Sequence, residues 1–531
     1  MSAATNISQP EAAVHGPSLA RDAMEFRSRL GNISRQSCVY FSGTVVATGA
    51  GYFFKIYLAR ELGAEALGIY ALGMTIVGFV AVFNSLGLPA AASRFVAAYS
   101  AKGESWKVAG FLRSGLSILT GVNVILGALI VIGGPYLAVH FYHAPTLSRY
   151  LWAFAAIMLL GVVNSFLGQV MAGYRDVTRR TVVTHFIGTP ANIVLAIGLI
   201  VLGFGLTGYL IAQIASAVLV TCLLGALVRR MTSFPHGPVH GYFDREVVTF
   251  STVAYGIAAL QFVLSQADMI ILGHYEAARL VGIYAVAMAL VGFVSIVLDS
   301  VNQIFSPIIS ELHATGNRLV LQQLYSTLTK WILVLTLPLA ITLLVFSRAV
   351  MSVFGATFTA GANVVVIGAV GQLLNCAVGS VGFLLLMSGH QAELMRIEAV
   401  NAALLLILNL VLVPRFGIAG AAIATACTTI TTNVWALNSV RRILKIFPYH
   451  AGYLKLVAPA IGTTAGVLIL AHAFGGFQKQ WQVAGAALVM AYVIFLGIIF
   501  LLGMDGEDRE LASLAWTRVG QSFRKMVMAW S

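Results

Sequence analysis

The chain has 531 residues, of which 59% are hydrophobic and only 10% are charged, whereas a soluble domain carries roughly 25% charged residues. This composition excludes a water-soluble globular protein and predicts a helical membrane protein. The net charge of +13 would suggest a nucleic-acid partner in a soluble protein, but here the basic residues lie in short loops between apolar stretches and indicate membrane topology.

Apolar stretches long enough to cross about 30 Å of hydrocarbon as helices recur from one end of the chain to the other. Glycines, prolines and charge clusters separate them. The fourteen predicted spans are 36–58, 67–88, 110–134, 150–172, 183–203, 207–228, 249–272, 281–304, 329–346, 361–387, 395–413, 417–438, 456–474 and 482–502.

These spans predict an all-α polytopic protein built from two six-helix lobes and two extra helices. A cytoplasmic tail at 1–34 without an apolar signal region precedes an N-lobe at 35–231 and a C-lobe at 245–443. Spans thirteen and fourteen occupy 455–503. The tail at 504–531 has apolar and basic residues at near-helical spacing, which is typical of a helix on the cytoplasmic leaflet, with a solvated tail as the alternative.

The distribution of Lys and Arg supports this map. With the N-terminus inside, 25 of the 32 basic residues fall in the loops and tails of one side. Retained cytoplasmic loops collect such residues. Both termini are therefore predicted to be cytoplasmic.

An internal repeat relates the two lobes. Residues 68–80 read GIYALGMTIVGFV and residues 282–294 read GIYAVAMALVGFV, identical at nine of thirteen positions and 214 residues apart. A second pair, FGLTG at 204–208 and FGIAG at 416–420, is 212 residues apart. Six spans separate the matched elements, so the lobes share one orientation and should be related by an axis along the membrane normal.

A few ionisable residues lie in or beside spans, where each costs about 2.5–3.5 kcal/mol at the bilayer centre. They are Lys55, Arg94, Asp268 and Asp299. One interpretation is that Lys55 and Arg94 attract an anionic headgroup while the two aspartates balance or gate them. The alternative is structural: Lys55 snorkels, Asp268 caps or pairs, and Arg94 is a topology charge.

Polar residues within spans add to these cavity candidates. They either line a cavity or hold helices together. The cavity candidates among them are Asn302, Gln303 and Gln372.

No catalytic motif is present in the sequence. His140 and His143 favour an interfacial aromatic belt over a metal site. The four cysteines lack the spacing of zinc or redox pairs. We therefore expect neither an enzyme nor a metal or other cofactor.

The stretch Leu58–Tyr99 resembles the signature of the Wzx-like oligosaccharide flippases in the multidrug, oligosaccharidyl-lipid and polysaccharide exporter superfamily. The resemblance is carried by the Leu62–Tyr70 element, the LGLPAAASRF run and the layout of about fourteen spans in two lobes. It implies alternating access around a central cavity and a lipid-linked oligosaccharide substrate on undecaprenyl diphosphate. It also implies that basic residues hold the diphosphate, and Lys55 and Arg94 match that role.

The resulting hypothesis is a bacterial inner-membrane flippase for exopolysaccharide, capsule or O-antigen units, with a polysaccharide polymerase and export machinery as protein partners. A cation-coupled drug or metabolite antiporter of the related multidrug-extrusion branch is the alternative, since Asp268 and Asp299 could couple transport to H+ or Na+. A membrane glycosyltransferase or polymerase would require a large extracytoplasmic loop, which the sequence lacks.

Overall fold

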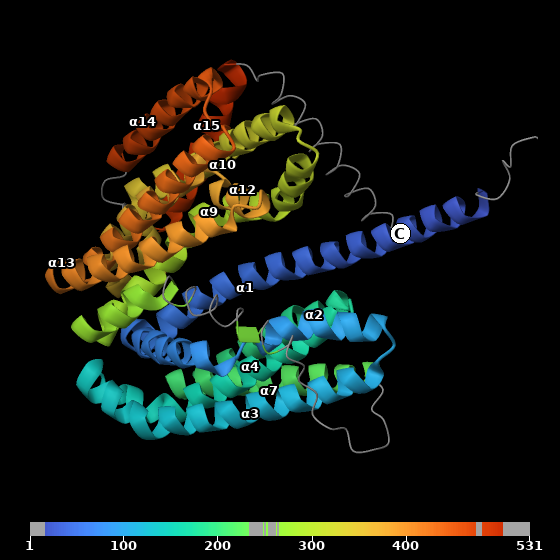
Figure 1. Ribbon diagram of the computed structural model, residues 1–531. Helices are drawn as coiled ribbons and strands as arrows, with labels where there is room; N and C mark the ends of the chain where they lie inside the picture. Colours follow the sequence, from blue (N-terminus) through green and yellow to red (C-terminus); the bar gives the residue numbers. More distant parts are fainter. Residues whose placement is uncertain are drawn as a thin grey trace, which may run out of the picture.

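The computed structural model describes residues 16–232, 248, 251–252, 262, 265–473 and 481–502. All regular elements in these ranges are helices (Figure 1). The tail at 504–531 and much of the seventh predicted span lie outside the described residues. In the N-terminal half the helices are α1 (Gly16–Asn84), α2 (Leu88–Ala101), α3 (Ser105–Tyr136), α4 (Leu151–Gly173), α5 (Val177–Thr181), α6 (Thr189–Val201) and α7 (Gly205–Met231).

In the C-terminal half, residues 265–275 form a helical segment that precedes a long hairpin of two helices. The named helices of this half are α9 (Ala278–Ala314), α10 (Arg318–Ser352), α11 (Ala362–Val378), α12 (Val381–Met387), α13 (Gln391–Ile443), α14 (Val457–Ala473) and α15 (Trp481–Leu502).

Eleven helices in the described ranges are long and apolar enough to cross a membrane. Two of the longest helices change direction at a glycine. Gly63 has φ 78° inside α1, and Gly417 has φ 55° inside α13. Only glycine adopts these dihedrals without steric cost. Each helix therefore supplies two of the predicted spans.

The second repeated motif forms similar turns in both lobes. Gly205 of FGLTG and Gly417 of FGIAG both have positive φ, 51° and 55°. In the N-lobe the turn separates α6 from α7, and in the C-lobe it divides α13. The prediction of an all-α, multi-pass, two-lobe protein is confirmed.

The predicted span at 361–387 is interrupted. Gly379, with φ 69° and ψ −144°, separates α11 from α12. A side chain at this position would overlap Thr329, and the Val378 carbonyl accepts a 2.7 Å hydrogen bond from the Tyr325 hydroxyl. Non-helical backbone at membrane depth is tolerated where protein buries it or where it lines a wet cavity.

The lobes share one hydrophobic core at one end and have separate cores at the other. The common core joins α1 residues such as Leu58 and Leu72 to α9 residues such as Val281 and Tyr284. We call this the shared end. At the opposite, split end, one core lies entirely in α2, α3, α4, α7 and residue 183, and another lies in α9 to α13 and the residues that follow α13. Figure 1 shows the N-lobe helices α2, α3, α4 and α7 on one side of α1 and the C-lobe helices on the other.

A reciprocal glycine contact joins the lobes at the shared end. A Cβ on Gly68 would overlap the Ala278 carbonyl, and a Cβ on Gly282 would overlap the Ala64 carbonyl. These four residues form two pairs related by the 214-residue repeat offset. Small residues allow such close backbone approach between membrane helices. The lobes thus meet at one surface that both supply.

Hydrogen bonds reinforce the shared end. Arg60 Nε donates to the Val353 carbonyl at 2.8 Å, and His274 Nδ1 donates to the Phe141 carbonyl at 2.8 Å. Both bonds cross from one lobe to the other.

Candidate functional site

A cavity of about 230 Å³ lies where the lobes meet, between α1, α7 and α9. Lys55 lines it together with Tyr52, Tyr70 and Tyr209. The Lys55 ammonium lies 5.1 Å from the centre of the Tyr52 ring. A cation over an aromatic face is stabilised by the ring quadrupole. We call this space the junction cavity.

A half-buried glutamine orients two tyrosines of the junction cavity. Gln213 Nε2 donates 2.9 Å hydrogen bonds to the hydroxyl oxygens of both Tyr70 and Tyr209. The two rings lie 5.2 Å apart. The cavity therefore combines one cation with hydroxyls whose positions are fixed, an arrangement that suits an anionic group carrying acceptor oxygens.

Asp268 lies within the C-lobe and is not paired with Lys55. Its carboxylate accepts a 2.6 Å hydrogen bond from the Tyr284 hydroxyl and a 2.8 Å bond from the Met269 amide. Tyr284 on α9 is completely buried. The carboxylate therefore finds its hydrogen-bond donors inside its own lobe, and the balancing or gating role assigned to Asp268 stays a prediction.

Three of the predicted residues are brought together in a second cavity. Asp299, Asn302 and Gln372 line a pocket of about 340 Å³ inside the C-lobe. The interruption at Gly379 also lines it. We call it the C-lobe pocket.

α13 contributes residues to the C-lobe pocket that the sequence analysis did not single out. They are Glu398, Asn401 and Asn433, together with Thr429 and Thr432. Glu398, like Asp299, is a carboxylate within a predicted span, and this feature could have identified it. It lies close to the start of the span 395–413, where a charged residue usually marks the end of a membrane helix.

Arg94 and Gln303 lie away from both cavities. Arg94 is exposed on α2, with its guanidinium 5.4 Å from the centre of the Phe95 ring. Gln303 is exposed on α9 and is not among the residues that line the C-lobe pocket. The roles assigned to both residues stay predictions.

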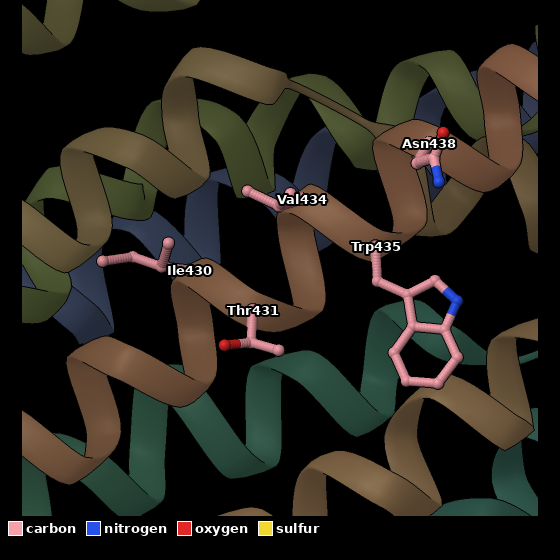
Figure 2. Close-up of a pocket in the computed structure, with 5 residues that line it drawn as sticks. All are labelled: Ile430, Thr431, Val434, Trp435 and Asn438. Carbon is pink, nitrogen blue, oxygen red and sulfur yellow. The ribbon is translucent and has the colours of Figure 1, made fainter.

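A further groove of about 570 Å³ lies on α13 (Figure 2). The described residues that line it come from little more than two turns of this one helix: Ile430, Thr431, Val434, Trp435 and Asn438. They include no charged side chain, in contrast to both cavities above. Among the described residues, no group of three or more His, Cys, Asp or Glu could hold a metal ion.

Solved structures with the same arrangement of helices are transporters. The lipid II flippase MurJ in an inward closed conformation matches with a TM-score of 0.61 and 14% identity, over 86% of this chain and 99% of that one. An inward-facing multidrug resistance MATE family transporter of the MOP superfamily matches with a TM-score of 0.60 and 15% identity, over 75% and 94%. The chain thus shares the multi-pass helical fold of these two structures.

The sequence pattern of polysaccharide biosynthesis proteins matches residues 33–313, and the chain belongs to this family. The chain is 24% identical over 483 residues to the probable low-salt glycan biosynthesis flippase Agl15 of Haloferax volcanii, covering 88% of this chain and 94% of that protein. It is 23% identical over 435 residues to the probable flippase AglR of the same organism, covering 79% and 86%.

Proposed function

We propose that this protein is a flippase that moves lipid-linked oligosaccharide across the membrane by alternating exposure of the space between its lobes. The lipid carrier is undecaprenyl diphosphate, and the direction is from the cytoplasmic to the outer leaflet of a bacterial inner membrane. The glycan units serve exopolysaccharide, capsule or O-antigen synthesis. A polysaccharide polymerase and export machinery are the protein partners downstream.

The observation that carries the proposal is the junction cavity. One cation and two hydroxyls held by Gln213 lie between two lobes that share a hydrophobic core at one end. A charged headgroup cannot cross hydrocarbon unaided, because even a single charge at the bilayer centre costs about 2.5–3.5 kcal/mol or more. Lys55 offers the diphosphate a charge partner at the lobe junction. The flippase function is further supported by two relatives, one named a probable low-salt glycan biosynthesis flippase and one a probable flippase.

The charge pattern supports an orientation. Arg94 on α2, Lys102 directly after it and Lys107 in the first turn of α3 lie near the split end. Arg229 and Arg441 lie in the last turns of α7 and α13 on the same side. Basic residues favour the cytoplasmic side. In this orientation the split end faces the cytoplasm, both termini are cytoplasmic, and the cleft receives its substrate from the inner leaflet.

The test is replacement of Lys55. Lys55→Ala should lower export of surface polysaccharide about tenfold or more at equal protein level, and Lys55→Arg should retain a larger share, because a hydrogen bond from a cation to phosphate contributes about 1.5–3 kcal/mol. Lys102→Ala, which removes an exposed lysine at the end of α2, is the matched control. Wild-type export by Lys55→Ala would contradict the role of the junction cavity.

A cation-coupled drug or metabolite antiporter is the second candidate. The observation that favours it is the presence of carboxylates in the C-lobe, Asp268 beside Tyr284 and Asp299 in the C-lobe pocket. Vesicles containing the purified protein distinguish the two functions. An antiporter would release a cationic dye when an H+ or Na+ gradient is imposed, and a flippase would move a labelled lipid-linked glycan.

A further inference from the structure

The C-lobe pocket is a polar space that the function proposed so far does not use. It holds Asp299 at an exposed position of α9 and Asn302, which is only 7% exposed, one turn further along. Its volume of about 340 Å³ lies within the range of roughly 300–1,000 Å³ that is typical of small-molecule sites. The pocket is large enough for a ligand rather than for a single water.

Two amides in this pocket have acceptors without a partner. Asn302 Oδ1 and Asn401 Oδ1 are buried and make no hydrogen bond within the described part of the chain. Buried polar atoms in native proteins are nearly always paired, and each exception calls for an explanation. These two acceptor oxygens, one on α9 and one on α13, could each accept a hydrogen bond from a ligand.

Other amides of the pocket are held in place by internal bonds. Asn375 Nδ2 donates to Gln372 Oε1 at 3.0 Å, and Asn433 Nδ2 donates to the Thr429 carbonyl at 2.8 Å. Amides arranged in this way donate to and accept from hydroxyl groups, and carboxylates accept from them. Vicinal hydroxyls of a sugar present both kinds of partner.

The charge of the pocket has one sign. Asp299 and Glu398 both line it, and none of the described residues that line it is Lys, Arg or His. This stands out in a chain with a net charge of +13. A carboxylate on the ligand would meet two like charges and no cation among the described lining residues, which weakens its binding strongly. An uncharged sugar or one bearing an amino group would not be repelled by these carboxylates.

We infer that the C-lobe pocket is the subsite that binds the glycan, that it takes neutral or amino sugars, and that Asp299 and Glu398 exclude sugars bearing a carboxylate. The inference rests on the proposed flippase function. It divides the substrate between two places joined by α9, whose residues Ala285 and Leu290 line the junction cavity while Asp299 and Asn302 line the pocket. At 1.5 Å per residue, the nearest pair of these residues, Leu290 and Asp299, is about 14 Å apart along the helix, and the farthest pair, Ala285 and Asn302, is about 26 Å apart.

The experiment uses the full-length protein in vesicles and two synthetic polyprenyl diphosphates of equal chain length. One carries a neutral disaccharide, and the other carries the same disaccharide with a terminal uronic acid. Wild type should move the neutral lipid about tenfold faster or more at subsaturating concentration. The double variant Asp299→Asn, Glu398→Gln should have a smaller ratio of neutral-lipid rate to uronic-acid-lipid rate, because it transports the uronic acid lipid faster than wild type does. Misfolding cannot produce such a gain in rate.

Two further variants complete the test. Glu311→Gln removes a carboxylate from the same helix outside the pocket and should leave the ratio unchanged. Asn302→Leu should raise the KM for the neutral glycan lipid about tenfold, because a site built for hydroxyls loses an unpaired amide, while the KM for polyprenyl diphosphate without sugar stays at the wild-type value.

The outcomes separate the two proposals. If wild type moves neither lipid faster than empty vesicles, the flippase function fails. If wild type moves both lipids equally, or if the double variant keeps the wild-type ratio, the glycan subsite is overturned. It is also overturned if the two carboxylates prove to confer only a sodium dependence shared by both lipids, since the pocket would then be a cation site.

Discussion

The hydrogen bond between Tyr284 and Asp268 satisfies a carboxylate within the C-lobe. The hydroxyl is 2.6 Å from Oδ2 and its ring is completely buried. We predict that Tyr284→Phe lowers the free energy of unfolding by about 1.5–3 kcal/mol, because the carboxylate loses a donor that water cannot replace. Thermal unfolding in detergent measures the change.

Tyr275→Phe is the matched control, because Tyr275 lies on the same helical segment as Asp268 and is 47% exposed. In the variant Asp268→Asn the cost of Tyr284→Phe should shrink, since the charged acceptor is gone. Equal losses of stability in both backgrounds would show that the hydroxyl stabilises the lobe by other means.

Single residues were predictable from the sequence only in part. A charged residue inside an apolar span is easily recognised in the sequence, and Lys55, Asp268 and Asp299 were identified in this way. Which group each one faces depends on packing between segments far apart in the chain. Asp268 turned out to contact Tyr284, and Asn401 and Asn433 of α13, which carry no charge, gave no signal that separated them from helix-packing amides.

At the scale of elements, the contact between α1 and α9 depends on glycine. Gly282→Ala should force the Ala64 carbonyl away and loosen the shared end, whereas Gly292→Ala on the same helix has open space around its Cβ. We predict that Gly282→Ala increases thiol labelling of a cysteine placed at Ala278 severalfold, while Gly292→Ala is neutral or slightly stabilising. Unchanged labelling in Gly282→Ala would mean that the shared end does not need close approach.

The segment between residue 275 and α9 carries a titratable group. Burial raises the pKa of Glu276 above its ordinary value of 4.5. The folded protein then holds this proton more tightly than the unfolded chain, so stability falls as the pH rises from 4.5 through the raised folded value. We predict that in Glu276→Gln the stability no longer falls over this pH range to the extent that Glu276 causes the fall.

The measurement is thermal unfolding between about pH 4 and 7. Glu65→Gln, which replaces an exposed carboxylate close to the start of the second span, serves as control and should follow wild type. A decline in Glu276→Gln as steep as in wild type would assign the pH dependence to other groups.

Elements were the part of the fold most open to prediction. Long apolar segments and glycine-marked turns fixed the spans, and the repeats indicated two lobes of one orientation. The break at Gly379 was not predicted, because hydropathy is continuous through 361–387 and only the close packing of Thr329 and Tyr325 requires the backbone to leave the helix there.

For the whole molecule, we propose that the two lobes exchange their contact at the shared end for one at the split end during transport. The shared core, the reciprocal glycine pairs and the bonds from Arg60 and His274 all lie at one end. The free energy lost when these contacts break must be offset by new contacts in the alternative state or by tighter binding of the ligand to that state. The lobes should therefore move as bodies.

The most direct test places spin labels at two pairs of exposed positions and measures both distances in vesicles. Glu65 with Arg279 spans the shared end, and Lys102 with Asn317 spans the split end. When a polyprenyl diphosphate disaccharide is added, the first distance should lengthen and the second should shorten in the same fraction of molecules. If the lipid is transported while both distance distributions stay unchanged, the two-lobe mechanism is contradicted.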